Sequence, residues 1–288
     1  MTDKNIPRAI LLFSCPDSKG IVAEVTHFIS VYGGNITDSN QHNDSETNTF
    51  FMRVAWDISD FDIPRDKITQ AFEPIAIKYN MDWRIEFSDR KTRMAIFVSK
   101  FDHCLYDILL RNKEGEIDAD IAMILSNHKD AEPIAEYFDI PFYYFPVKRE
   151  NKTELEKEEI SLLKKNNIDL VVLARYMQIL SPEFVKEFRN KIINIHHSFL
   201  PAFAGAKPYH KAFERGVKII GATSHYVTED LDEGPIIEQD VVRVSHKDGI
   251  PDLIRKGRDI EKLVLSRALK LHIDHRILVF RNRTVVFD

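Results

Sequence analysis

The sequence contains very little cysteine. Only Cys15 and Cys104 occur among its 288 residues, and they lie far apart in the chain. Two such cysteines exclude a disulfide framework and a zinc site with four cysteine ligands. Both are expected to be buried thiols, and a reducing compartment fits this cysteine usage best.

An excess of positive charge and a long hydrophobic run are also missing. Lys and Arg number 40 against 45 Asp and Glu, a formal net charge of −5. Nucleic-acid binding depends on a basic surface that displaces counterions, so this balance argues against it. No stretch approaches the ~20 apolar residues of a membrane span, and the N-terminus lacks a signal-peptide cleavage pattern. We expect a soluble cytoplasmic protein with a small-molecule partner, no nucleic acid and no membrane.

The length predicts two domains. Up to residue 88, apolar runs and helical spacings follow the order β-α-β-β-α-β, which is typical of a ferredoxin-like α+β unit. The segment "SDRKTR", residues 88–93, has no apolar residue and is the best candidate for a linker. The predicted boundaries are therefore residues 1–88 and 89–288.

From Met94 onward, continuous apolar strands alternate with helices. This pattern predicts an α/β domain with a Rossmann-like, mostly parallel sheet covered on both faces. Two later strands, around residues 218–228 and 235–244, are candidates for antiparallel pairing. A long helix is expected over residues 250–273, and the tail resembles a hairpin turning at Asn282 and Arg283. The charged run "KTELEKEEI" is interpreted as the solvated face of a helix.

The segment "NIHHS" ends one of the apolar strands with polar side chains. Strand alternation places Asn194 and His196 on one face and His197 on the other. In open parallel sheets ligands bind beyond the carboxyl ends of strands, so this position favours function. A histidine satisfied in the core and a structural asparagine are the competing interpretations.

A second segment, "TSHYVTEDLDEG", offers His225 and then a loop with Asp230, Asp232 and Glu233. Taken alone, this is a solvated acidic loop. Together with the first segment, it supplies an amide for an oxyanion, an imidazole for proton transfer and a carboxylate to orient the imidazole. Ser198 lacks the strained elbow of a nucleophilic serine, so water or a second substrate's amine must attack.

These segments resemble the folate-dependent formyltransferase family over nearly all of residues 93–288. Its members share an Asn-x-His strand end with an Asp 36 positions after the His, which matches Asn194, His196 and Asp232 as the catalytic residues. "LARYMQILSPEF" is similar to the family's folate-contacting segment. The resemblance implies folate as substrate rather than cofactor, no metal, and substrate contacts by Gln178, Ile179, Leu180, His225, Glu229, Asp230 and Gly234.

Within that family, the chain is most similar to the bacterial formyltetrahydrofolate deformylases. It has no glycine in "VSKFDHCLYDIL", where the glycinamide ribonucleotide transferases carry a phosphate loop, and it has His197 where they have Pro. Phe101, His103 and Leu105 are candidates for filling that space. The N-terminal unit resembles an ACT domain, which the deformylases share. The implied reaction is hydrolysis of 10-formyltetrahydrofolate to formate and tetrahydrofolate, which supplies formate for purine synthesis and balances one-carbon folate pools.

The resemblance implies that His196 and Asp232 activate water while Asn194 stabilises the oxyanion, with a supporting role for His197. Three alternatives remain open: a transferase that formylates an amine, a non-catalytic folate or amino-acid sensor, and a metal hydrolase. A transferase would depend on its acceptor, turnover would exclude a sensor, and a metal hydrolase would lose activity to a chelator.

The ACT-like unit suggests a homo-oligomer with an amino-acid effector, such as glycine or methionine. The candidate effector site comprises two short turn segments and contains Asp17, Lys19, Gly20, Gly34 and Asn35. The competing interpretation is that these glycines only supply turns, and that the unit only assembles oligomers.

Overall fold

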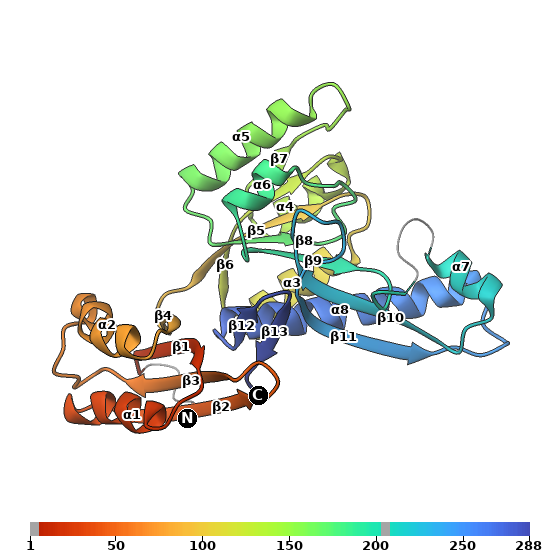
Figure 1. The fold of residues 1–288 in the computed structure, drawn as a ribbon. Helices are drawn as coiled ribbons and strands as arrows, with labels where there is room; N and C mark the ends of the chain where they lie inside the picture. Colours follow the sequence, from red (N-terminus) through yellow and green to blue (C-terminus); the bar gives the residue numbers. More distant parts are fainter. Residues whose placement is uncertain (1–5, 203–207) are drawn as a thin grey trace. The chain divides into compact units, whose positions relative to one another are not determined.

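The computed structural model describes residues 6–202 and 208–288 (Figure 1). The chain divides into two compact units. The first comprises Met1–Lys91, Asp274–Leu278 and Val285–Asp288, and the second comprises Thr92–Ile273 and Val279–Thr284. The predicted boundary at residue 88 stays a prediction, but the structure groups much of the chain end with the first unit.

The first unit is built on an antiparallel sheet in the order β2-β3-β1-β4. Its elements are β1 (Arg8–Pro16), α1 (Ile21–Val31), β2 (Asn35–Asp44), β3 (Thr49–Asp57), a short 3-10 turn (Arg65–Lys67), α2 (Ile68–Lys78) and β4 (Asp82–Phe87). This is the β-α-β-β-α-β order that the sequence predicts. Alternating residues of β1 and β3, such as Leu11, Phe13 and Trp56, form a core with Phe28 of α1 and Phe72 of α2.

The opposite face of that sheet is buried as well. Leu12 and Phe51 are at most 1% exposed. Arg53 of β3 donates hydrogen bonds to the carbonyls of Asp274 and His275, and Arg84 of β4 donates to Ile277. The last strands, β12 (Ile277–Phe280) and β13 (Arg283–Val286), pair with each other. Their turn begins at Arg281, one residue earlier than predicted, and Arg281 adopts the left-handed region with φ 55°.

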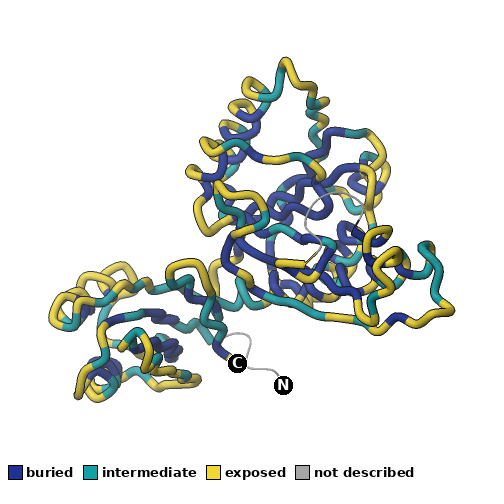
Figure 2. The backbone as a smooth tube through the Cα atoms, turned by 45° about the vertical axis from the view of Figure 1, so that its right-hand side comes forward, coloured by how far each residue is buried: buried dark blue, intermediate teal, exposed yellow. Residues whose placement is uncertain are grey.

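The second unit contains a seven-stranded sheet in the order β11-β10-β9-β8-β5-β6-β7. Five strands pair in parallel: β5 (Thr92–Val98), β6 (Ala119–Ser126), β7 (Phe142–Tyr144), β8 (Leu170–Leu173) and β9 (Ile192–His196). Two antiparallel strands, β10 (Ile219–Tyr226) and β11 (Ile236–Arg243), extend it beyond β9. The predicted mostly parallel α/β sheet is therefore confirmed, and Figure 2 colours its central strands as buried.

Among the described residues of the second unit, the helices that flank this sheet are α3 (His103–Lys113), α4 (Glu132–Tyr137, after a 3-10 turn at Lys129–Ala131), α5 (Lys152–Lys165), α6 (Pro182–Glu187), α7 (Pro208–Arg215) and α8 (Ile250–Ile273). The long α8 packs against α3, α7 and the strands β9 to β11. Among the helices of the described ranges, none has both the length and the apolar character required to cross a membrane.

The interpretation of "KTELEKEEI" as a solvated face is wrong for two of its residues. Glu156 and Glu159 of α5 are 6% and 1% exposed. They lie three residues apart, at the helical spacing that also brings Ile160 and Leu163 toward the core. The charge run therefore contains a buried acidic pair as well as solvated residues.

Candidate active site

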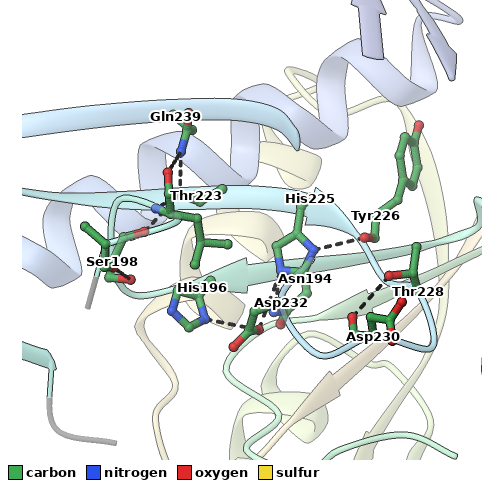
Figure 3. Close-up of polar contacts among 12 residues, drawn as sticks. Asn194, His196, Ser198, Thr223, His225, Tyr226, Thr228, Asp230, Asp232 and Gln239 are labelled. Atoms are coloured by element: carbon green, nitrogen blue, oxygen red, sulfur yellow. Dashed lines mark hydrogen bonds and ion pairs between the residues drawn. The ribbon is translucent and has the colours of Figure 1, made fainter. Parts of the chain in front are cut away.

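Asn194 and His196 lie on β9, next to the antiparallel strand β10. In the register of the two strands, Asn194 is opposite His225 and His196 is opposite Thr223. Because side chains two apart share a face, these four side chains lie on one side of the sheet. Figure 3 shows Asn194, His196 and His225 converging on Asp232.

Asp232 reaches this point from the loop between β10 and β11. Its backbone adopts φ 60°, a left-handed conformation that Asp tolerates better than most residues. Gly234 is buried, and a Cβ there would lie 1.8 Å from the carbonyl oxygen of Tyr226. Only glycine permits this close approach of the loop to β10, so Gly234 helps to place Asp232.

His196 is anchored through one ring nitrogen. Its Nδ1 lies 3.2 Å from Oδ1 of Asp232, which fixes the tautomer with the proton on Nδ1. The pKa of Asp232 is lowered, chiefly by this hydrogen bond and despite partial burial. Within residues 6–202 and 208–288, Nε2 of His196 is buried and has no hydrogen-bond partner. In the neutral imidazole, Nε2 is therefore a hydrogen-bond acceptor without a partner among these residues.

Asn194 is oriented by His225. The Asn194 amide Nδ2 donates to Nε2 of His225 at 3.2 Å, and Nδ1 of His225 donates to the carbonyl of Tyr226 at 2.9 Å. Burial lowers the pKa of His225, so the ring is neutral and its Nε2 accepts. Nε2 also lies 3.8 Å from Asp232, but a neutral ring that donates through Nδ1 has no proton for that contact. His225 is 2% exposed and lies beside Asn194 on the neighbouring strand.

His197 lies against His196 rather than on the opposite face. The strand β9 ends at His196, so strand alternation does not extend to the next residue. The two rings stack with centroids 5.3 Å apart and an interplanar angle of 29°. Burial and then the charge of Arg175 lower the pKa of His197 to about 4. This ring is neutral at physiological pH.

The predicted folate-contacting residues differ in exposure. Gln178 is half-buried, Ile179 is 60% exposed, and Leu180 lies in the hydrophobic core below the loop. Glu229 and Asp230 are exposed on the Asp232 loop. The structure thus places Gln178 and Ile179 on the surface of a loop that follows β8, while Leu180 anchors it.

Two residues that sequence reasoning missed support the chain after His197. Thr223 accepts from the amide of Leu200 and donates to the carbonyl of Ser198. Gln239 of β11 donates to Thr223 and to Leu200. Thr223 shares the strand face of His225, so alternation along β10 was the available signal. Gln239 lies on another strand, and no sequence signal pointed to it.

An open hollow of about 480 Å³ adjoins the site. It is lined by His197, Phe199, Tyr209, Gly221 and Val241, among others. It therefore lies beside the residues predicted to be catalytic rather than around them. One further group, His103, Cys104 and Glu261, has possible metal ligand atoms within 4.8 Å of one another. Arg175 lies 3.6 Å from this Glu261 carboxylate, and burial raises the pKa of the Cys104 thiol, so both features oppose metal binding.

The candidate effector residues lie in the first unit. Asp17, Lys19 and Gly20 precede α1, whereas Gly34 and Asn35 follow it. An 11-residue helix separates the two segments, about 16 Å at 1.5 Å per residue. One copy of the chain does not bring them together. Gly34 serves packing, since a Cβ there would lie 2.7 Å from Ile29 and 2.9 Å from Trp56.

The chain resembles known proteins over nearly its whole length. Residues 92–269 match the family model described as formyl transferase. A formyltetrahydrofolate deformylase of Synechocystis sp. is 56% identical, covering 97% of this chain and 98% of that protein. The formyltetrahydrofolate deformylase of Bacillus subtilis is 47% identical, covering 99% and 96%.

Solved structures give the same result. A formyltetrahydrofolate deformylase from Pseudomonas syringae superimposes with a TM-score of 0.97 at 49% identity, covering 99% of this chain and 96% of that one. A glycinamide ribonucleotide transformylase from Symbiobacterium toebii matches with a TM-score of 0.66 at 30% identity, covering 70% and 97%. The chain belongs to the formyl transferase family and, within it, to the formyltetrahydrofolate deformylases.

Proposed function

We propose that the protein hydrolyses 10-formyltetrahydrofolate to formate and tetrahydrofolate, with Asn194, His196 and Asp232 as its catalytic residues. The observation that carries these roles is the asymmetry of His196. One ring nitrogen is held by Asp232, and within the described residues the other has no partner. An imidazole anchored in this way is suited to take a proton from water.

In the proposed reaction, Nε2 of His196 accepts a proton from the water that attacks the formyl carbon. Asp232 stabilises the resulting imidazolium. Asn194 then donates its remaining N–H to the tetrahedral oxyanion, since its other N–H is directed at His225. The bond between the formyl carbon and N10 breaks, His196 returns the proton to N10, and formate leaves.

Folate is proposed to lie between the two exposed loops. Gln178 and Ile179 would contact it on one side, and Glu229 and Asp230 on the other. Leu180 and Gly234 would act through the backbone of these loops, because one is buried in the core and the other packs on Tyr226. His225 would act by orienting Asn194, and His197 by packing against His196.

The test is formate release from 10-formyltetrahydrofolate by the wild-type protein without an added amine. Asp232→Asn keeps the size of the side chain but removes the charge, and turnover should fall by roughly 10²–10⁴, the range for losing a general acid–base function. Glu233→Gln is the matched control, because its exposed side chain lies on the same loop and is not in the proposed site. Equal turnover in Asp232→Asn and wild type would refute the assignment.

Formyl transfer to an amine is the second candidate, favoured by the similarity to the Symbiobacterium toebii transformylase. A transferase would release little formate until an acceptor amine is added. Acceptor dependence therefore separates the two reactions.

For the N-terminal unit, we propose assembly into a cytoplasmic homo-oligomer that binds an amino-acid effector. Since the two candidate segments lie at opposite ends of α1, each would form its own contact or meet the other segment from another copy. Calorimetry of the whole chain with glycine and with methionine tests the effector. No binding heat with either would reject this pair.

A further inference from the structure

A buried polar cluster lies beside the proposed active site, and the proposed mechanism makes no use of it. We call it the Glu261 cluster: Glu261 of α8, Arg175 after β8, His103 of α3 and Tyr209 of α7. Glu261 is 1% exposed. Its carboxylate accepts hydrogen bonds from Tyr209 at 2.5 Å and from His103 at 2.8 Å, and it lies 3.6 Å from Nε of Arg175.

The cluster adjoins His196 through two routes. Leu173, aligned with Asn194, is the last residue of β8 paired with β9, and Arg175 follows two residues later, close enough for its charge to lower the pKa of His197. The Tyr209 ring lies 6.1 Å from that of His197, which stacks on His196. His103 begins the helix that follows β5. The strand order reverses between β5 and β8, and in open parallel sheets ligands bind in the crevice beyond the carboxyl ends of the strands at such a point.

The conformation and burial of Arg175 destabilise the folded protein. The residue adopts φ 64°, a conformation that disfavours a side chain, and it is only 8% exposed. Among the described residues, its Nε and Nη1 atoms are buried without hydrogen-bond partners. Unpaired buried donors destabilise a fold. A buried, strained arginine with unpaired donors beside the proposed active site points to a role in function.

Further contacts hold Arg175 and Tyr209 in place. The Arg175 guanidinium lies 5.2 Å from the centre of the Phe101 ring, and Arg258 lies 5.5 Å from the same ring. Gly257 of α8 makes room for Tyr209, because a Cβ there would lie 2.0 Å from its hydroxyl. Burial favours the neutral form of Glu261, but the hydrogen bond from His103 and the charge of Arg175 outweigh it, so the pKa of Glu261 is lowered. The carboxylate is therefore charged, and it attracts the Arg175 guanidinium across 3.6 Å.

We infer that Arg175, held by Glu261 and Phe101, excludes amines from the crevice beside His196, so that water is the acceptor of the formyl group. This inference rests on the proposed hydrolysis. Water and an amine would attack the same carbon with the same base. They differ in that an amine brings a substituent, and on this inference the Arg175 side chain occupies the space that the substituent needs.

Removing the side chain should therefore change which acceptor reacts. In Arg175→Gly, the nitrogen of a small amine attacks the formyl carbon, the bond to N10 breaks, and His196 moves one amine proton to N10. The products are a formylated amine and tetrahydrofolate. Glycine also suits the positive φ at this position, so the backbone is retained.

Methoxyamine is a suitable probe, because it is small and uncharged at neutral pH. With 10-formyltetrahydrofolate and methoxyamine, the wild type should release formate alone. Arg175→Gly should raise the ratio of formylated methoxyamine to formate by about tenfold or more, since steric selection in a pocket is typically worth 10 to 200-fold. Asn190→Gly is the matched control: Asn190 also has positive φ, at 56°, but is exposed before β9. It should behave as wild type.

The product ratio distinguishes exclusion from simple destabilisation, which lowers both products together. Arg175→Asn is the second variant, because Asn tolerates positive φ and is shorter than Arg. Transfer in neither variant, or transfer by the wild type itself, would overturn the inference. Failure of the proposed function looks different: the wild type would then release no formate at all.

Discussion

At the scale of single residues, the amide of Asn194 is set by its neighbours. It has two N–H groups, and one is directed at the neutral ring of His225. The amide plane is therefore fixed before substrate binds, and the second N–H is held for the reaction. A preorganised donor of this kind stabilises an oxyanion without reorganisation at the moment of reaction.

Asn194→Ala should reduce kcat by about 10²–10³, the usual effect of losing one oxyanion donor. Folate binding should be largely kept, because the folate loops belong to other segments of the chain. Single-turnover rates and a folate Kd for the variant check both statements. An unchanged kcat would show that Asn194 does not serve the oxyanion.

The sequence could predict Asn194, His196 and Asp232 because two short motifs contain them. It could not predict how they are supported. His225 is paired with Asn194 only through the β9–β10 register, and Arg175, Glu261 and Tyr209 meet from three separate elements. No local sequence pattern encodes such contacts. In an amphipathic helix, the sequence around a buried Glu does not differ from the sequence around a solvated Glu.

At the scale of elements, α5 supports the folate loop through its buried acidic pair. Glu156 accepts a hydrogen bond from the amide of Ser181, and Glu159 accepts one from the hydroxyl of Tyr176. These partners lie at either end of the loop that contains Gln178 and Ile179. Burial, and then the negative charge of Glu156, raise the pKa of Glu159 to about 8. Glu159 is therefore mainly protonated at neutral pH.

The raised pKa predicts that stability decreases at alkaline pH. The folded state holds the Glu159 proton more tightly than the unfolded state, whose ordinary value is 4.5. This stabilisation is complete below that value and is lost as pH rises through about 8. The urea midpoint, followed by circular dichroism, should fall between pH 6 and pH 9, and less so in Glu159→Gln. Glu154→Gln, exposed on the same helix, should retain the wild-type dependence, and equal slopes in both variants would contradict this role.

Most elements were predictable because their apolar patterns are strong. The parallel strands are continuous apolar runs, and α8 has a clear helical period. Elements that are buried by segments distant in the sequence were harder to predict. The tail was predicted as a hairpin of the second domain, yet residues of both its strands belong to the first unit, where Ile277 accepts a hydrogen bond from Arg84.

At the scale of the whole molecule, the chain end completes the N-terminal unit. Arg53 is 7% exposed and its Nε donates to His275 at 2.8 Å, while its other contacts include Asp38. Arg84 donates to Ile277 at 2.6 Å, and Phe287 is 2% exposed. A fragment that ends near residue 90 lacks these partners. Effector binding should therefore be measured on the whole chain.

Deleting residues 274–288 should destabilise the N-terminal unit, which includes Asp274–Leu278 and Val285–Asp288. Arg53 would lose its carbonyl acceptors on Asp274 and His275, at a cost of about 1–3 kcal/mol, and the burial of the Phe287 side chain would be lost. The chain has two tryptophans, Trp56 and Trp83, and both lie in this unit. Tryptophan fluorescence in urea therefore reports on it alone, and the midpoint should fall. Removing only the exposed Asp288 should leave the midpoint nearly unchanged, because its loss does not expose the apolar face of the sheet. If the long deletion also left the midpoint unchanged, the tail would not be part of the unit's stable core.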